Sequence, residues 1–270
     1  MTAQLSAVAR VLPVNLGSRR ASLLIERNVY IYRRGWLVIF SGFFEPLFYL
    51  FSIGLGIGGI VREVPGPDGN PIPYALFVAP ALLATASMNG AIAESTFNVF
   101  FKLNYQKTYD AVLATPLGPG DVALGEIGWA VIRATLYAIG FVVVIVLLGL
   151  ARSPWVVLTI PAATLLAFAF AAAGMAATTF MRTWQDFDLI QLVVLPLFLF
   201  SGTFYPISAY PPALQAFVQL TPLYQGVATI RMLTTGTVDA SIVFHVAYLA
   251  VMGLIGLVVV ERRLDRLLLK

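Results

Sequence analysis

Six long apolar stretches constrain the fold of this chain more than any other feature of its sequence. A bilayer core about 30 Å thick requires about 20 residues of α-helix per crossing, and inside it only helices and closed barrels satisfy the backbone hydrogen bonds. The stretches are Trp36–Ile60, Tyr74–Phe100, Val122–Leu150, Trp155–Met181, Leu189–Tyr205 and Ile242–Val260. The fifth is the shortest and is interrupted by Pro196. The sequence therefore predicts an all-α integral membrane protein with six transmembrane helices, in a domain that covers residues 36–260.

The composition agrees with a membrane protein and excludes most kinds of catalytic site. Hydrophobic residues make up 59% and charged residues 11% of the 270 positions, against about 45–50% and about 25% in soluble domains. The sequence has no cysteine and one histidine, His245, which excludes thiolate chemistry and histidine metal clusters. It has no Gly-Lys pair, and therefore no phosphate-binding loop of the G-x-x-x-x-G-K-[ST] type. We expect a chain that is not an enzyme, with no catalytic, cofactor-binding or metal-binding residue and no nucleic-acid partner.

Basic residues predict which side of the membrane each connecting segment occupies. The N-terminal segment 1–35 carries six Arg, the loop 101–126 two Lys, the segment after the fourth span one Arg, and the tail 261–270 three Arg and one Lys, thirteen in all. The opposite loops carry only Arg62, Arg152 and Arg231. Because short cytoplasmic loops are enriched in Lys and Arg, we expect both termini and the 101–126 loop in the cytoplasm.

The loop 101–126 is unusually polar for so apolar a chain. Its charged residues are Lys102, Lys107, Asp110, Asp121 and Glu126. The stretch Leu103–Thr115 predicts a short helix and Pro116–Gly120 predicts a turn, after which Asp121 stands where a helix N-cap belongs. On pattern alone, this loop is either an ordinary connection between two helices or a contact site for another protein.

Two further segments predict helices that do not cross the membrane. Between residues 18 and 34, arginines fall on one helix face and apolar side chains on the other, as in helices that lie in a membrane interface; a plain extension of the first span is the alternative. Residues 206–236 contain Pro212 and Pro222, each placed to start a short helix, and Gly236, placed to end the second. We expect this second segment to form a re-entrant helical hairpin in the outer leaflet.

Three ionisable residues lie within the predicted spans: Glu45, Glu94 and Arg133. Ionisable groups at membrane depth are costly and usually face the interior of a bundle. They predict either a polar lining with buried ion pairs, or side chains that reach back to the nearby cytoplasmic interface. Their positions in the sequence do not distinguish these alternatives.

The chain resembles the permeases of type-2 ABC transporters, the ABC-2 family, over nearly all of its length after residue 20. The resemblance rests on EPLFYLFSIGLGIG from Glu45, on YDAVLATPL from Tyr109 with GDVALGE from Gly120, and on FSGTFYPISAYPPALQ from Phe200 with TPLY from Thr221 and Arg231. The last of these is the most specific. Within the family, the chain is most similar to permeases of the nodulation-protein-J type, which export lipooligosaccharides, and to drug exporters.

The resemblance implies a six-span permease subunit in the plasma (inner) membrane that works with a second permease copy or a paralogue and with ABC ATPase subunits. The ATPases would bind ATP and Mg, and the loop 101–126 would contain the coupling helix. Residues expected to contact the ATPase are Lys102, Tyr105, Lys107, Tyr109, Asp110 and Arg27. An amphipathic substrate (a lipid, glycolipid, lipooligosaccharide or drug) would move along the aromatic residues of the first and fifth spans, and membrane lipids would surround the chain. These are Phe43, Phe44, Phe48, Tyr49, Phe198 and Phe200, for which ordinary helix packing is the alternative.

Two other classes of function fit a polytopic chain. A lipid-modifying membrane enzyme requires a polar catalytic cluster at one membrane face, and no such cluster is evident in the sequence. An ion-coupled secondary carrier predicts an inverted internal repeat with broken midplane helices, and no such repeat is evident. We therefore expect ATP-driven export of an amphipathic molecule, with these two classes as alternatives.

Overall fold

The computed structural model describes residues 20–33, 44, 46–66 and 69–268. Within this part of the chain, four helices are long and apolar enough to cross a membrane: Tyr74–Asn104, Pro119–Leu147, Pro154–Thr178 and Ser241–Leu268. They correspond to the second, third, fourth and sixth predicted spans. The first predicted span lies partly outside the described residues, and its described part is the apolar helix Pro46–Val61. The structure confirms a helical chain with several apolar spans, and the number six stays a prediction.

The described elements follow one another in the order expected of consecutive crossings. In chain order they are α2 (Ala21–Arg33), a π-helical segment (Leu50–Ile57), α4 (Gly58–Val61), β1 (Glu63–Pro65), β2 (Pro71–Pro73), α5 (Tyr74–Ala93), a π-helical turn (Glu94–Asn98), α6 (Val99–Asn104), α7 (Thr108–Leu113), α8 (Pro119–Leu147), a 3-10 turn (Pro154–Leu158), α9 (Thr159–Thr178), α10 (Asp186–Phe200), a 3-10 turn (Ile207–Ala209), α11 (Pro212–Gln219), α12 (Pro222–Thr235) and α13 (Ser241–Leu268). The antiparallel pair β1–β2, with Val64 opposite Ile72, is a departure from the all-α prediction. It forms because the Pro/Gly-rich loop folds back on itself.

The core is a bundle in which α9 packs against α5, α8 and α13. Small residues allow these helices to approach closely, as is usual between membrane helices. A Cβ atom at Gly256 of α13 would lie 2.8 Å from the backbone carbonyl carbon of Ala172 in α9, which leaves no room for a side chain. Ala167, Ala171 and Ala172 of α9 are fully buried.

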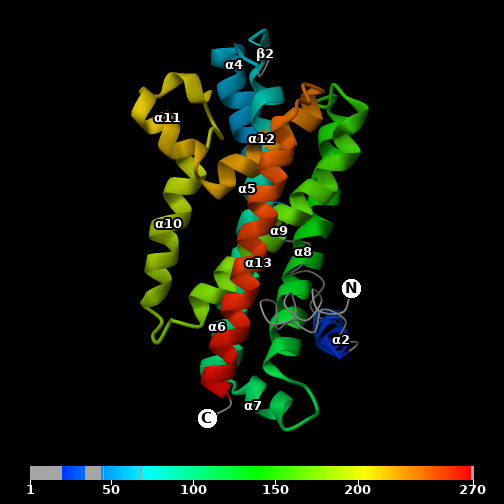
Figure 1. Cartoon of the computed structure of the whole chain (residues 1–270). Coiled ribbons are helices and arrows are strands. Elements are labelled where there is room, and N and C mark those ends of the chain that lie inside the picture. Colours follow the sequence, from blue (N-terminus) through cyan, green and yellow to red (C-terminus); the bar gives the residue numbers. More distant parts are fainter. Residues whose placement is uncertain (1–19, 34–43, 45, 67–68, 269–270) are drawn as a thin grey trace, which may run out of the picture.

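The connecting segments collect at two opposite ends of the bundle (Figure 1). At one end lie α7, the link between α9 and α10, and the C-terminal end of α13; at the other lie α4, β2 and α11. This is the grouping that the distribution of basic residues predicts. Which of the two ends faces the cytoplasm stays a prediction, since no membrane is part of the structure.

Three predicted boundaries around the polar loop are wrong by a few residues. The short helix α7 covers Thr108–Leu113 rather than Leu103–Thr115. It cannot begin earlier, because Lys107 has a left-handed backbone conformation (φ 50°) that breaks the helix at this residue. The next helix begins at Pro119, not after an Asp121 N-cap. Proline is favoured in a first helical turn, and the Asp121 carboxylate accepts a hydrogen bond of 3.0 Å from the backbone N–H of Gly118.

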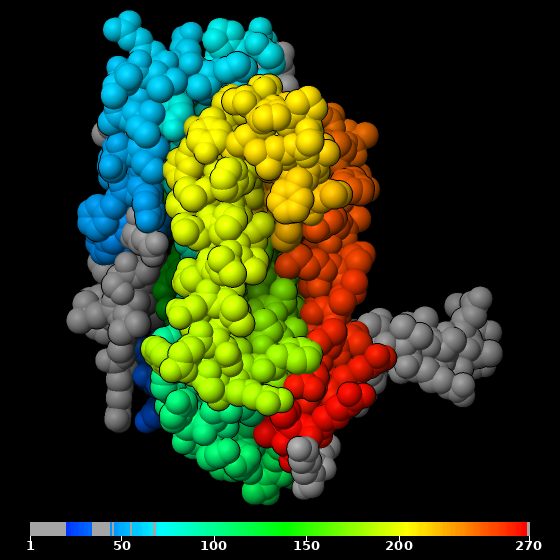
Figure 2. Space-filling view, turned by 90° about the vertical axis from the view of Figure 1, so that its left-hand side faces the viewer, coloured from blue at the N-terminus to red at the C-terminus, as the bar shows by residue number. Residues whose placement is uncertain are grey.

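The fifth predicted span is displaced toward its N-terminus. Helix α10 covers Asp186–Phe200, 15 residues, rather than Leu189–Tyr205. It starts early because the Asp186 carboxylate accepts hydrogen bonds from the backbone N–H groups of Arg182 (2.7 Å) and Thr183 (3.0 Å). It ends before Gly202, whose φ of 70° turns the chain. No residue of α10 is buried, and Figure 2 shows the helix exposed on the surface.

The hairpin that follows α10 has the predicted helices. Helix α11 begins at Pro212 and α12 at Pro222, and Gly236 closes α12 with a φ of 85°. Arg231 of α12 fastens the hairpin to the bundle, because its guanidinium donates hydrogen bonds to the backbone carbonyls of Phe77 and Gly202. That this hairpin lies in the outer leaflet stays a prediction.

Candidate functional site

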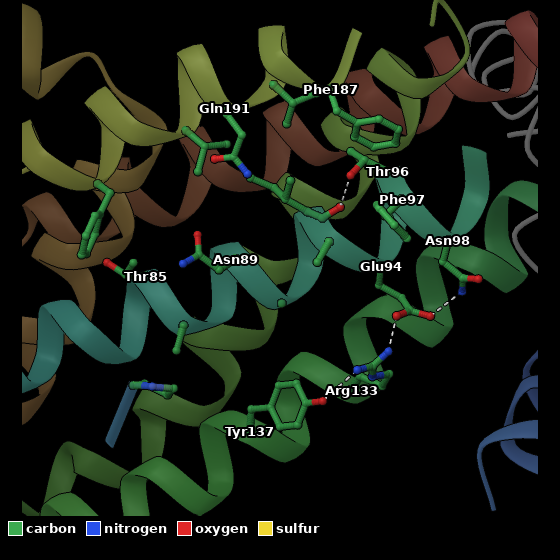
Figure 3. Close-up of a pocket in the computed structure, with 18 of the residues that line it drawn as sticks. Thr85, Asn89, Glu94, Thr96, Phe97, Asn98, Arg133, Tyr137, Phe187 and Gln191 are labelled. Atoms are coloured by element: carbon green, nitrogen blue, oxygen red, sulfur yellow. Dashed lines mark hydrogen bonds and ion pairs between the residues drawn. The ribbon is translucent and has the colours of Figure 1, made fainter. Parts of the chain in front are cut away.

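A cavity of about 880 Å³ lies between α5, α10 and the described part of the first span. We call it the polar cavity, because polar side chains of several helices line it, among them Asn89 of α5, Arg133 of α8 and Gln191 of α10 (Figure 3). Its polar lining residues are Tyr32, Tyr49, Thr85, Asn89, Glu94, Thr96, Asn98, Gln106, Arg133, Tyr137 and Gln191. Apolar residues of α10, among them Val194, Leu195 and Phe198, close the other wall. A cavity with both kinds of surface suits an amphipathic ligand.

An ion pair between Glu94 and Arg133 forms part of the cavity wall. The Glu94 carboxylate also accepts hydrogen bonds from the Asn98 amide (2.6 Å) and the Tyr32 hydroxyl (3.2 Å). The Arg133 guanidinium donates to the hydroxyls of Tyr137 (2.8 Å) and Tyr32 (3.3 Å). Only 6% of the Glu94 side chain and 14% of the Arg133 side chain are exposed. Of the two alternatives for these residues, the structure favours the buried ion pair; Glu45 lies outside the described residues.

A second ion pair, between Lys102 of α6 and Glu126 of α8, is buried closer to the α7 end. The Lys102 ammonium lies 2.8 Å from a Glu126 carboxylate oxygen, and their side chains are 7% and 1% exposed. Asn28 of α2 contacts both: its amide nitrogen donates to Glu126 and its amide oxygen accepts from Lys102, each at 3.2 Å. Buried charges are tolerated when they are paired and hydrogen-bonded in this way.

The residues predicted to contact an ATPase divide into exposed and buried groups. Tyr105, Lys107 and Asp110 are exposed. They lie in or just before α7, which Figure 1 shows at one end of the bundle. Lys102 and Tyr109 are 6% and 1% exposed, so both side chains point into the chain. Burial raises the pKa of the Tyr109 phenol well above its usual range, and the nearby Glu126 carboxylate adds to this shift.

Arg27, the remaining predicted contact, is half-buried on α2. For all six residues, contact with an ATPase stays a prediction. Within the chain, Lys102 forms an ion pair with Glu126, and Tyr109 is buried in the core.

The aromatic residues predicted to line a substrate path do not all face the polar cavity. Tyr49 and Phe198 line it, with ring centroids 5.9 Å apart. Phe44 and Phe48 stack on each other instead, and Phe200 packs near Tyr210. Phe43 lies outside the described residues. Contact of these residues with a substrate stays a prediction.

Several residues of the site were not singled out by the sequence, notably Asn28, Tyr32, Asn98, Tyr137 and Gln191. A spacing signal for the ion pairs was nevertheless present. Glu94 precedes Lys102 by eight residues on one predicted helix, and Glu126 precedes Arg133 by seven on the next. Because consecutive spans run antiparallel, this order brings each carboxylate opposite a cation of the other helix.

The comparisons with known proteins agree with this architecture. The family model described as "ABC-2 type transporter" matches residues 19–234. The chain belongs to the ABC-2 type transporter family. It is 30% identical to nodulation protein J of Rhizobium leguminosarum bv. viciae, over 89% of this chain and 93% of that protein. It is 31% identical to nodulation protein J of R. leguminosarum bv. trifolii, over 89% and 92%, and 25% identical to the inner membrane transport permease YadH of Escherichia coli K12, over 72% and 74%.

As an ABC-2 permease, the chain is a multi-pass membrane protein and a transporter membrane subunit rather than a catalytic one. Membership of this family implies association with an ABC ATPase. The polar cavity and the exposed α7 end are the two surfaces of this permease that are suited to contact a substrate and a partner protein.

Proposed function

We propose that this chain is the membrane subunit of an ABC exporter that moves an amphipathic molecule out of the cytoplasmic leaflet. ATP is hydrolysed by a separate subunit. The observation that carries the proposal is the polar cavity, whose two walls differ in chemistry. Amide, hydroxyl and charged side chains of α5 and α8 meet a polar head, and the apolar face of α10 meets a hydrocarbon or aromatic portion.

The ATPase contacts the α7 end through the coupling loop, which we define as residues 105–118. Three observations support this assignment. The loop carries the exposed Tyr105, Lys107 and Asp110, it protrudes from the bundle beyond α6 and α8 (Figure 1), and the basic residues of the sequence favour its cytoplasmic side. Tyr109 anchors it inside the chain.

A second permease copy covers α10 and the first span. Large apolar side chains along α10 are exposed, among them Leu189 (62%), Leu192 (69%) and Leu195 (56%). On its other side, α10 borders an apolar cavity of about 780 Å³ against α9 and α13. A helix so weakly attached to its own bundle is suited to an interface between copies, with the substrate path beside it.

Transport in reconstituted vesicles tests the proposal. The permease, with and without its ATPase, is placed in liposomes that carry lipid probes with a nitrobenzoxadiazole label, one with a sugar head and one with a phosphocholine head. Dithionite then reports the fraction of probe in the outer leaflet. We expect movement of a probe only with the ATPase and ATP together. Movement driven by an ion gradient without ATP would contradict the proposal in favour of a secondary carrier, and covalent change of a probe by the permease alone would indicate an enzyme.

A further inference from the structure

Two buried ion pairs join the same two helices. The continuous helix Tyr74–Asn104 contributes Glu94 and Lys102, and α8 contributes Arg133 and Glu126. Residues seven or eight apart on a helix are separated by about 11 Å along its axis, at 1.5 Å per residue. The two pairs therefore lie two turns apart, one beside the polar cavity and the other next to the coupling loop.

Helix α2 bridges both ion pairs with two neutral side chains. Asn28 donates to Glu126 and accepts from Lys102, and four residues later Tyr32 donates to Glu94 and accepts from Arg133. Residues four apart occupy the same face of a helix. Each bridging group thus contacts the anion and the cation of one pair, and a single face of α2 contacts both pairs.

The fit of α2 on α8 is close enough to make this bridge stiff. A Cβ atom at Gly125 would lie 2.7 Å from the Cβ of Leu24, and one at Gly128 would lie 3.0 Å from the Cδ1 of Ile25. The Tyr32 ring packs on Trp129, with centroids 5.2 Å apart. Because α8 has glycines here, the Leu24 and Ile25 side chains of α2 pack directly on its backbone. A displacement of α2 therefore displaces α8 and the groups bonded to both.

The two ends of this bridge differ in what they contact. Glu94, Arg133 and Tyr32 line the polar cavity. The Lys102–Glu126 pair lies beside Tyr109, the one buried residue of α7. A movement of the coupling loop therefore reaches the Lys102–Glu126 pair first. From there the helix Tyr74–Asn104, α8 and α2 all extend to the cavity wall, and α2 is the one that bonds to both of the others at both levels.

We propose that Asn28 and Tyr32 are positioning residues that keep the two ion pairs in register, so that α2 transmits movement of the coupling loop to the wall of the polar cavity. The role of this link in transport rests on the function proposed above. The mechanical coupling of the two ion pairs through α2 does not depend on that function. Neither residue is expected to contact ATP or to be required for binding of the ATPase.

Amide hydrogen exchange on the full chain in lipid nanodiscs tests the mechanical part without an ATPase or a substrate. Asn28→Leu removes both bonds to the Lys102–Glu126 pair, and Tyr32→Phe removes one hydroxyl and keeps the ring on Trp129. We expect Asn28→Leu to increase exchange in the π-helical turn Glu94–Asn98 by about fivefold, the effect of a loss of stability at that turn equal to one net hydrogen bond. The double variant is expected to differ from the sum of the two single ones. Tyr30→Phe, on the exposed face of α2, is the matched control and changes nothing.

Exchange that increases only next to each substituted residue, with additive effects in the double variant, would overturn the proposal. A second measurement uses the permease–ATPase complex in liposomes. Tyr32→Phe is expected to raise the ATP hydrolysed per lipid probe moved by about fivefold and to leave ATPase binding unchanged. An unaltered ratio would also overturn the proposal. If the wild-type complex moves no probe with ATP, the proposed function fails, whereas the exchange result still decides the link.

Discussion

The two walls of the polar cavity are attached to the rest of the molecule in different ways. The wall formed by α5 and α8 is held by two buried ion pairs, by the α2 bridge and by close contact of α9 with both helices. The opposite wall, α10, has no buried residue. Ring contacts hold it near its ends, such as Phe187 with Phe100 at one and Phe198 with Phe204 at the other.

The α5 and α8 wall is therefore rigid, and the α10 wall is free to move. We call them the rigid wall and the movable wall. Interfaces packed as tightly as those of α5, α8 and α9 resist continuous deformation, whereas a helix with few buried contacts opens at low cost. Binding and release of a large substrate require the cavity to change volume. For the function proposed above, we therefore expect α10 to supply this change, and α5 and α8 to supply fixed polar contacts.

The largest expected effect is on the rigid wall. Lys102→Met leaves the Glu126 carboxylate buried without its cation, which costs about 3–5 kcal/mol. We expect a large loss of folded protein and a lower unfolding temperature in detergent. Lys107→Met, which alters an exposed lysine of the coupling loop, is the control and should have little effect. Equal unfolding temperatures for both variants would show that the rigid wall does not depend on this ion pair.

Close packing of α2 provides the next prediction. Gly125→Val places a side chain where Leu24 lies, and overpacking of this kind costs about 1–3 kcal/mol. Helix α2 should separate from α8, so that limited proteolysis cleaves between α2 and α5 faster than in the unaltered protein. Gly56→Val is the comparison, because a Cβ at Gly56 meets nothing within 4 Å. Protection of α2 in the Gly125 variant would contradict the assignment of this contact.

On the movable wall, a large-to-small change is expected to have little effect on the isolated chain. Leu192→Ala alters a side chain that is 69% exposed, so the unfolding temperature of the monomer in detergent should stay constant. If a second copy covers α10, the dimer should dissociate several-fold more readily, as native mass spectrometry would measure. Leu147→Ala, which alters a leucine of α8 that is also largely exposed (79%), should leave the dimer intact. The same dimer affinity for both variants would remove α10 from the interface.

The smallest expected effect is at the start of α10. Hydrogen bonds from the backbone N–H groups of Thr183 and Arg182 lower the pKa of the exposed Asp186 carboxylate. This contribution is therefore fully present above the usual pKa of an aspartate, about 3.9, and is lost as the pH falls through the lowered value. Above pH 5, Asp186→Ala should lower the protection factors of residues 182–186 a few-fold, whereas a change of pH between 6 and 8 should leave the protection factors of the unaltered chain, corrected for the intrinsic exchange rate, unchanged. Unchanged exchange in the variant would mean that Asp186 does not order this turn.

The sequence was sufficient to predict the parts of this fold that depend on local patterns. Apolar length located four long apolar helices to within a few residues, except that the last helix continues to Leu268. Pro212, Pro222 and Gly236 marked the hairpin helices because their backbone preferences act locally. The same local rules failed at Lys107, where a residue without special preference takes a left-handed conformation.

The candidate site was less predictable, because it depends on which faces of distant helices meet. Lys102 was predicted to contact an ATPase from its place in a polar loop, but it lies against Glu126, which is 24 residues away. Asn28 has an unremarkable place in the sequence, and its importance comes from contacts with residues 74 and 98 positions away. The sequence could not tell which aromatic residues of the spans line the cavity, because the rotation of each helix about its axis decides which side chains face it.

Cross-linking at single cysteines tests the assignment of the coupling loop most directly, because the natural chain has no cysteine. The variants Lys107→Cys and Asp110→Cys lie in the coupling loop, and Phe217→Cys lies in the opposite hairpin, where that side chain is 66% exposed. Each is treated with a short photoactivatable maleimide in native membranes that contain the ATPase. We predict an ATPase adduct, identified by mass spectrometry, from Lys107→Cys and Asp110→Cys and none from Phe217→Cys. An adduct from Phe217→Cys alone would place the hairpin on the ATPase side of the membrane and would contradict the predicted topology.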